Sequence, residues 1–190
     1  MNAAIDISKT VLKTKRLTLR PWCQDDLEDF YDYAKVDGVG QMAGWLPHEN
    51  MDISREILNR FVEGNKTFAL EYRGKVIGSL GIEVYKEDMF PALEKLSGRS
   101  IGYVLSKAYW GQRIMPEAVQ AVIQYLFEEV KLDFLVISHY VWNDQSRRVI
   151  EKCGFHYMKT IRLQTRYNTV EETRVYILWN PERRTENVTA

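Results

Sequence analysis

The sequence predicts a single mixed α/β domain, and three observations lead to that fold class. Several short segments alternate apolar and polar residues or are almost entirely apolar, as strands are. Longer segments place apolar residues three or four positions apart, which is typical of amphipathic helices. A strand, a long helix and a second strand follow one another over residues 100–141. This order predicts a crossover between two adjacent parallel strands.

The first half of the chain is expected to hold three strands and two helices. Asp52 is expected to cap the second helix and Gly64 to end it. The pair Arg73-Gly74 predicts a tight hairpin between the second and third strands. In chain order the segments are strand 15–22, helix 24–35, loop 37–50, helix 52–64, strand 66–72 and strand 75–85.

The second half starts with an inserted loop at 87–100 and continues with the predicted crossover. Apolar residues recur at helical spacing between residues 115 and 130, and this is the clearest helix of the chain. Either Asn143 or Asp144 is expected to cap a shorter helix that Gly154 ends. The expected strands are 100–106, 133–141, 156–168 and 172–180. Residues 1–190 are interpreted as one domain with its core over about residues 14–180 and short flexible termini.

The composition argues against several classes of protein. The chain has 26 basic and 26 acidic residues, so it has no net charge to attract nucleic acid or an anionic membrane. No apolar run is long enough to span a bilayer, and no apolar signal segment begins the chain. Cys23 and Cys153 fit neither a disulfide framework nor a metal-ligand spacing. We therefore expect a cytoplasmic protein without a metal, a nucleic-acid partner or a membrane partner.

The stretch WGQRIMPEA, residues 110–118, lies between the strand 100–106 and the long helix. The first N–H groups of a helix have no intrahelical partner, and together with the helix dipole they favour an anion such as a phosphate. The flexible Gly111 allows close approach of the backbone. The stretch therefore predicts a cradle for a diphosphate, and the alternative is an ordinary turn without a ligand. The free amides belong to Gln112, Arg113, Ile114 and Met115.

The loop WGQRIMPEA is followed, one helix and one strand later, by a second motif. This motif is carried by Asn143, Ser146, Lys152, Gly154 and Phe155. The pair resembles WGxGxxxEA and NxxSxxxxxKxGF of the GCN5-related N-acetyltransferase (GNAT) superfamily, and more closely of its ribosomal-protein-alanine acetyltransferase (RimJ/RimL) subgroup. The segments KRLTLRP and AGWLPHEN also resemble that subgroup, and the likeness covers roughly residues 14–180.

The resemblance implies the GNAT fold, a mostly antiparallel twisted sheet with a splayed pair of parallel strands, flanked by helices. It implies that acetyl coenzyme A binds between those strands as co-substrate. Its pyrophosphate would lie on the loop and the helix N-terminus, and its pantetheine arm along the preceding strand. The implied coenzyme-binding residues are Val104, Leu105, Ser106, Gly111, Gln112, Arg113, Ile114, Met115 and Asn143.

The resemblance also implies that a primary amine attacks the thioester directly. Ser146 lies where the subgroup places a hydroxyl near the sulfur, so we expect it to act as a general acid or to hold a water. The alternative is that Ser146 only helps to cap its helix. Some members have a glutamate about ten residues after the GF pair, but here that position falls near Thr165. Glu83 is then the best candidate for the general base, and the alternative is an exposed strand residue.

Two departures from the family pattern concern the coenzyme loop. Arg113 stands where many relatives have a second glycine. If that position needs a positive φ, the arginine costs about 1 kcal/mol, and otherwise it is free to clamp a phosphate. Pro116 stands where many relatives have a threonine. The pair Arg147-Arg148 is either a contact for the 3′-phosphate of the coenzyme or a solvated helix face.

Trp45 and His48 are the candidate acceptor-binding residues. They lie in the loop between the first two helices, and in this family that loop overhangs the acceptor site. Trp45 is expected to form an apolar wall and His48 to face the substrate. The alternative is a surface loop that packs its own tryptophan.

Three functions compete at this point. The leading one is an N-acetyltransferase that uses acetyl coenzyme A and a primary amine, either a protein N-terminus or a small molecule. The second is a module that keeps the GNAT fold and binds acyl coenzyme A or a protein without catalysis. The third, an unrelated nucleotide-binding protein, lacks support because neither GxGxxG nor GxxxxGK[ST] occurs. The sequence leaves the oligomeric state open, a homodimer included.

Overall fold

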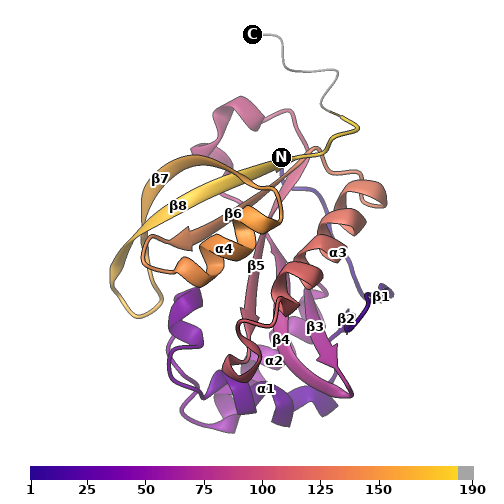
Figure 1. Ribbon diagram of the computed structural model, residues 1–190, viewed down its shortest axis with the longest axis vertical. Coiled ribbons are helices and arrows are strands. Elements are labelled where there is room, and N and C mark those ends of the chain that lie inside the picture. Colours follow the sequence, from indigo (N-terminus) through magenta and orange to yellow (C-terminus); the bar gives the residue numbers. More distant parts are fainter. Residues whose placement is uncertain (184–190) are drawn as a thin grey trace.

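The computed structural model of the protein describes residues 1–183. The tail that was expected to be flexible includes residues 184–190, which lie outside the described residues. One eight-stranded sheet forms the centre, in the order β1-β2-β3-β4-β5-β6-β8-β7 (Figure 1). Neighbouring strands are antiparallel except for the parallel pair β5 and β6. The predicted mixed α/β class and the predicted parallel pair are therefore confirmed.

The elements follow the predicted order, with one short strand added at the start. The strands are β1 Leu12–Lys13, β2 Thr18–Pro21, β3 Thr67–Tyr72, β4 Lys75–Glu83, β5 Gly98–Leu105, β6 Phe134–Tyr140, β7 His156–Gln164 and β8 Val170–Trp179. The helices are α1 Leu27–Ala34, α2 Met51–Gly64, α3 Ile114–Glu128 and α4 Asp144–Lys152. Short 3₁₀ turns are η1 Gln24–Asp26, η2 Gly40–Ala43, η3 Glu87–Met89, η4 Pro91–Leu93 and η5 Lys107–Tyr109.

Helix α3 is the long crossover helix that the apolar spacing predicted. Pro116 lies in its first turn, where a missing N–H costs nothing because that group has no intrahelical acceptor. Each fully buried aliphatic side chain contributes about 1.5–3 kcal/mol of transfer free energy. The inner face of α3, which carries several such side chains, therefore holds the helix against the sheet. The buried apolar residues of that face include Ala118, Val119, Val122 and Leu126.

The ends of two other helices settle questions that the sequence left open or answered wrongly. Asn50, not Asp52, caps α2, because its extended backbone lets its side chain accept a hydrogen bond from the Ile53 N–H at 3.1 Å. That helix runs through Gly64 and ends at the left-handed Asn65. Asn143 caps α4. The hairpin between β3 and β4 turns at Arg73-Gly74 as predicted, since both residues have a positive φ.

The N-terminal segment is part of the core, which corrects the expectation of a flexible start before about residue 14. Ile7 is fully buried and Ile5 nearly so. Residues two positions apart in an extended segment face the same side, so both isoleucines reach the core while Asp6 stays exposed. The Ile7 N–H donates to the Asn65 carbonyl at 2.9 Å, and β1 pairs with β2.

Helices cover the sheet on both faces (Figure 1). Helices α3 and α4 pack over the largest apolar cluster, which includes Ile101 and Ile137. Helices α1 and α2 pack on the opposite face, over a second cluster that includes Ala69. A third cluster under η3 and η4 covers the Val136 end of that face. Among the described residues, no helix is long and apolar enough to cross a membrane.

Strands β5 and β6 separate soon after they begin. Their parallel ladder joins Gly98 to Phe134 and ends where Ser100 meets Val136. Beyond that point β5 continues to pair with β4 as far as Leu105, while β6 pairs with β8. Alternate N–H groups of a strand point to opposite neighbours, so β5 has a free edge over residues 101–105. Two cavities open at this separation.

Candidate active site

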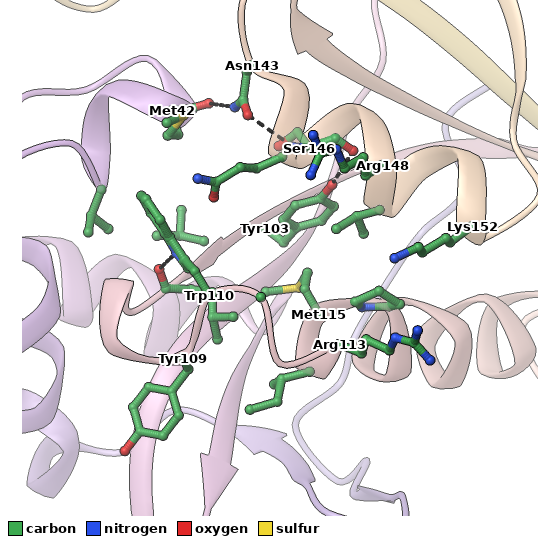
Figure 2. Close-up of a pocket in the computed structure, with 18 residues that line it drawn as sticks. Met42, Tyr103, Tyr109, Trp110, Arg113, Met115, Asn143, Ser146, Arg148 and Lys152 are labelled. Atoms are coloured by element: carbon green, nitrogen blue, oxygen red, sulfur yellow. Dashed lines mark hydrogen bonds between the residues drawn. The ribbon is translucent and has the colours of Figure 1, made fainter.

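The first cavity, of about 350 Å³, lies between the start of α3 and the start of α4, with the end of β5 as its floor (Figure 2). Its middle is lined by apolar groups such as Val39, Trp110 and Val149. An apolar channel with a polar end suits a ligand that has a narrow arm and an anionic head. Seven of the nine predicted coenzyme-binding residues line this cavity: Val104, Leu105, Gly111, Arg113, Ile114, Met115 and Asn143.

The loop that leads into α3 presents a row of unpaired backbone donors. Within residues 1–183, none of the N–H groups from Gly111 to Met115 donates a hydrogen bond to another backbone group. Gly111 and Arg113 are both left-handed, with φ of 78° and 58°. Left-handed residues in such a turn direct neighbouring N–H groups into one concave surface, which is an anion-binding arrangement. Arg113 therefore accepts the backbone strain of a glycine position, at a cost of about 1–2 kcal/mol.

Arg16, in the bend between β1 and β2, contacts this loop from the side opposite the cavity. Its Nη1 donates to the Gln112 carbonyl and its Nη2 to the Arg113 carbonyl, both at 2.9 Å. In a planar trans peptide the carbonyl and the next N–H point in opposite directions. With the two carbonyls turned toward Arg16, the N–H groups of Arg113 and Ile114 must turn away from it. The arginine thus fixes the orientation of the donors.

Glu117 holds Arg16 in place. The Arg16 Nε donates to its carboxylate at 2.7 Å, and the Arg16 N–H donates to it at 2.8 Å. The Thr14 hydroxyl donates to the same carboxylate at 2.6 Å. Partial burial raises the pKa of Glu117, but these hydrogen bonds outweigh burial, and the net effect is a lowered pKa. The carboxylate therefore stays ionised and keeps the guanidinium aligned.

Three positive side chains line the first cavity: Arg113, Arg148 and Lys152. Within the described part of the chain, none of them forms an ion pair. In Figure 2, Arg113 and Lys152 lie at one end of the cavity, and Met42 lies at the other. Arg147 differs, because it pairs with Asp144 at 2.9 Å and with Glu151 at 3.1 Å. Of the Arg147-Arg148 pair, only Arg148 lines the cavity.

The second cavity, of about 220 Å³, opens on the sheet face that carries α1 and α2. Gly81 of β4 lies opposite Gly102 of β5, so the floor there has no side chains. This gap separates the second and third apolar clusters and leaves a hollow in the sheet surface. Glu83 lies on the same strand face as Gly81 and lines the hollow. Its other walls include Ser100, Ser138, Tyr140, Leu163 and Thr173.

Ser146 lies where the two cavities meet, since it lines both. Its N–H donates to the Asn143 Oδ1 at 3.0 Å, and its carbonyl accepts from the Tyr103 hydroxyl at 3.2 Å. Its own hydroxyl forms no hydrogen bond within residues 1–183. Burial raises the pKa of Tyr103, so that phenol stays protonated and keeps donating. The backbone of Ser146 is held fixed while its hydroxyl remains available.

Asn143 connects α4 to the η2 turn that covers both cavities. Its Oδ1 caps the helix through Ser146, and its Nδ2 donates to the Met42 carbonyl at 3.2 Å. Met42 in turn lines both cavities. Asn143 is only 1 % exposed, so its amide is committed mainly to the protein rather than to a ligand. The Asn143 side chain therefore positions the η2 turn over the place where the two cavities meet.

The structure does not bring Trp45 and His48 to either cavity. His48 is buried, its Nδ1 lies 2.7 Å from the Ser54 hydroxyl, and its ring centre lies 5.0 Å from that of Trp45. The loop packs its own tryptophan, which was the alternative interpretation. Ser106 also lines neither cavity, and its N–H donates to the Ile77 carbonyl at 2.7 Å. Gln112 contributes a free N–H to the loop, while its side chain turns back to Ala108.

Sequence reasoning missed Tyr103, Met42 and Arg16. Tyr103 lines both cavities and fills the gap between the separated strands. It stood inside the predicted strand 100–106, but no local signal shows which strand residue faces a gap. Arg16 belongs to KRLTLRP, which was noted only as a resemblance. Met42 had no local signal, since its position depends on contacts with Asn143 about a hundred residues later.

The first cavity has the free N–H groups and positive side chains that suit a phosphate-bearing ligand, and the second is a smaller cavity beside it. The chain belongs to the GNAT acetyltransferase family, because the model of the GNAT acetyltransferase domain matches residues 16–156. No metal is implied by this arrangement, and the residues described contain no cluster of three or more His, Cys, Asp or Glu that would suit one.

Two relatives from Bacillus subtilis (strain 168) illustrate the sequence similarity. YkkB, an uncharacterised protein, is 31% identical over 181 residues, which cover 89% of this chain and 98% of YkkB. The protein called "Probable N-acetyltransferase YjcK" is 41% identical over 83 residues, or 43% of this chain. The matched part spans less than half of YjcK, 46% of its length.

Solved structures agree with the fold. A GNAT-family acetyltransferase from Bacillus anthracis superposes with a TM-score of 0.78 at 22% identity, covering 90% of this chain and 99% of that one. The microcin C7 self-immunity acetyltransferase MccE, solved with acetyl-CoA and AMP, superposes with a TM-score of 0.73 at 18% identity. The superposition covers 87% of this chain and 93% of the MccE chain.

Proposed function

We propose that the protein transfers an acetyl group from acetyl coenzyme A to the nitrogen of a primary amine. The observation that carries this proposal is the meeting of two cavities of different character at one free hydroxyl, that of Ser146. One cavity suits a long anionic ligand and the other a small polar one. Family membership supports acetyl transfer as the reaction, and MccE is a relative in fold that binds acetyl-CoA.

The first cavity fits coenzyme A in three respects. The free N–H groups of residues 111–115 suit a pyrophosphate at the start of α3. Arg113 and Lys152 add positive charge at one end of the cavity, where the remaining phosphate is expected, and Arg148 adds a third positive charge nearer Ser146. The apolar middle and the free edge of β5 suit an amide-containing arm, because unpaired strand groups bind such arms as another strand would.

The chain's own groups would then serve the transfer. A nitrogen–carbon bond forms as the carbon–sulfur bond of the thioester breaks. A free N–H of β5 is the donor for the negative charge that develops on the carbonyl oxygen. The Ser146 hydroxyl, or a water that it holds, supplies the proton to the leaving sulfur. The proton lost by the amine passes through water to Glu83, which lines the second cavity and is exposed.

Two measurements test this function. Acetyl-CoA at about 100 times its Kd stabilises a protein by about 2.7 kcal/mol, which for this size is a rise in Tm of about 5–11 °C. Free coenzyme A should give a similar rise, and NAD and ATP should not. Release of free thiol should then depend on an added amine. No change in Tm at millimolar acetyl-CoA would contradict the proposal.

The alternative, a module that binds acyl coenzyme A without catalysis, predicts the same rise in Tm but no thiol release with any amine. The lack of an acid near Thr165 and the strained Arg113 were the reasons to consider it. The two cavities sharing Ser146 favour catalysis, because a binding module has no need of a second cavity at the reacting end. A cytosolic location, and a homodimer as the active form, stay predictions.

A further inference from the structure

The second cavity carries one kind of charge only. Among its fourteen lining residues, Glu83 is the sole carboxylate, and no lysine or arginine is present. His139 also lines it, but burial lowers the pKa of His139, so the ring is neutral near pH 7. The other polar groups are hydroxyls, such as those of Ser100, Ser138 and Thr173. The cavity therefore favours a cation and offers an anion hydroxyl donors but no positively charged partner.

Three basic side chains of the surrounding segments do not line the cavity. Arg99 precedes Ser100, so it faces the opposite side of β5, where its Nε donates to the Ala3 carbonyl at 2.7 Å. Lys159 donates to the Met89 carbonyl and lies over the Phe90 ring. Arg166 is exposed near the β7–β8 turn and does not line the cavity. None of the three side chains therefore supplies a positive charge to the cavity around Gly81 and Gly102.

The cavity is also small. Its volume of about 220 Å³ corresponds to roughly seven water-sized groups. The groups attached to the amine-bearing carbon must therefore lie within it, close to Glu83. A carboxylate on that carbon would lie close to the Glu83 carboxylate with no positive side chain in the lining, and this like-charge repulsion is unfavourable. An amide or a methyl group at the same place has no such penalty.

We infer that the acceptor is a primary amine whose amine-bearing carbon has no free carboxylate, so that free α-amino acids are excluded. This inference rests on the proposed acetyl transfer and names its acceptor class. Two sources share the chemistry: small alkylamines, and the N-terminus of a polypeptide, where the carboxylate has become an amide. The second cavity selects against amino acids because no positive side chain lines it, and not because of its shape.

The test is a matched series of amines with the wild-type protein and acetyl-CoA, followed by thiol release. Alanine, alaninamide and isopropylamine differ only in carrying a carboxylate, an amide or a methyl group, and the same three forms are used for the leucine side chain. Isopropylamine is a stronger base than alanine, so a preference for it does not reflect a larger unprotonated fraction. We expect kcat/KM for the amino acids to be lower by at least about 100-fold.

A variant adds a gain-of-function arm. Leu163→Arg places a cation on a half-buried wall residue of the edge strand β7, and Gln164→Arg adds the same charge one position along, outside the cavity. We expect Leu163→Arg to raise the ratio of alanine to isopropylamine turnover by at least about 10-fold. Gln164→Arg should leave that ratio as in the wild type.

The outcomes separate this inference from the proposed function. Activity with alaninamide but not isopropylamine indicates a polypeptide acceptor, and the reverse indicates a small amine; both support the inference. Alanine or leucine within about 10-fold of its methyl analogue overturns the inference while acetyl transfer stands. Thiol release with no amine of the series, amino acids included, although acetyl-CoA raises Tm, overturns the proposed function and this inference with it.

Discussion

The two cavities that meet at Ser146 are built in different ways. The anion-binding end of the first is built from one continuous stretch, residues 111–116 at the start of α3, whose backbone donors Arg16 holds in place. The second takes its walls from β4, β5, β6, α4, β7, β8 and the η2 turn. A backbone site tolerates changes of side chain, whereas a site assembled from seven elements changes with almost any of them. We expect relatives to share the coenzyme site and to differ in the acceptor site.

The largest expected effect is at Ser146, one of the three residues that line both cavities. Ser146→Ala removes the hydroxyl but keeps the helix cap, because the cap uses the Ser146 N–H. Loss of a general acid typically lowers turnover by about 100-fold or more. We expect kcat to fall by that order while the Kd of acetyl-CoA, measured by calorimetry, changes little. Ser138→Ala removes a hydroxyl from the second cavity only and should lower kcat much less. Equal losses of kcat in the two variants would mean that Ser146 has no specific role in the transfer.

The next effect concerns the backbone site alone. Arg16→Lys keeps the charge but removes the fork that binds the Gln112 and Arg113 carbonyls. Losing hydrogen bonds to a charged donor should weaken acetyl-CoA binding by about 10-fold. Arg20→Lys is the control, since Arg20 pairs with Asp26 and Glu71 away from the loop. An unchanged Kd in Arg16→Lys would mean that the loop orients its donors without help.

Adjacent arginines offer a smaller and sharper test. Arg148→Ala removes a charge that lines the first cavity and has no ion-pair partner within the described residues. Arg147→Ala removes one that is already paired with Asp144 and Glu151. We expect coenzyme A to bind about fivefold more weakly to the first variant, with the difference shrinking at high salt. Similar affinities of the two variants for coenzyme A would mean that the Arg148 side chain faces solvent and does not contact the coenzyme.

At Arg113, the effect of left-handed backbone strain on Tm can be measured separately from the effect of the side-chain charge on coenzyme A binding. Arg113→Gly should relieve up to about 1 kcal/mol of left-handed strain and raise Tm by about 2–4 °C. It should also weaken coenzyme A binding, because a positive charge is lost from the cavity. Lys131→Gly relieves the same kind of strain at φ 64°, outside the cavity. A rise in Tm with unchanged binding is expected there, and a fall in Tm for both would refute the strain argument.

The smallest effect concerns two buried histidines, of which His139 lines the second cavity and His48 lies outside both cavities. Burial lowers the pKa of His48 and of His139 in the folded state. The unfolded chain then binds more protons below its own value of about 6.5. The stabilisation is therefore complete above about pH 6.5 and is lost as the pH falls below it. Urea midpoints at pH 7.5 and 5.5 should show this loss, and His48→Gln should reduce it.

The sequence predicted the fold better than the acceptor site, for physical reasons. Apolar spacing is local, so α3, the crossover and the hairpin at Arg73-Gly74 followed directly from it. The row of free N–H groups at residues 111–115 was also predictable, because it needs only a strand end and a helix start. The acceptor side depends on which segments meet far apart in the chain. Trp45 and His48 were therefore assigned to it, while Met42 and Tyr103 line it.

The most direct test of the central claim uses a conjugate in which coenzyme A is joined through its sulfur and an acetyl linker to isopropylamine. Such a molecule spans both cavities only if they meet at Ser146. Calorimetric titration should show it binding at least about 10-fold more tightly than coenzyme A alone. It should also lose this advantage when Gly102→Leu fills the floor of the second cavity. Affinity equal to that of coenzyme A would mean that the two cavities do not form one site.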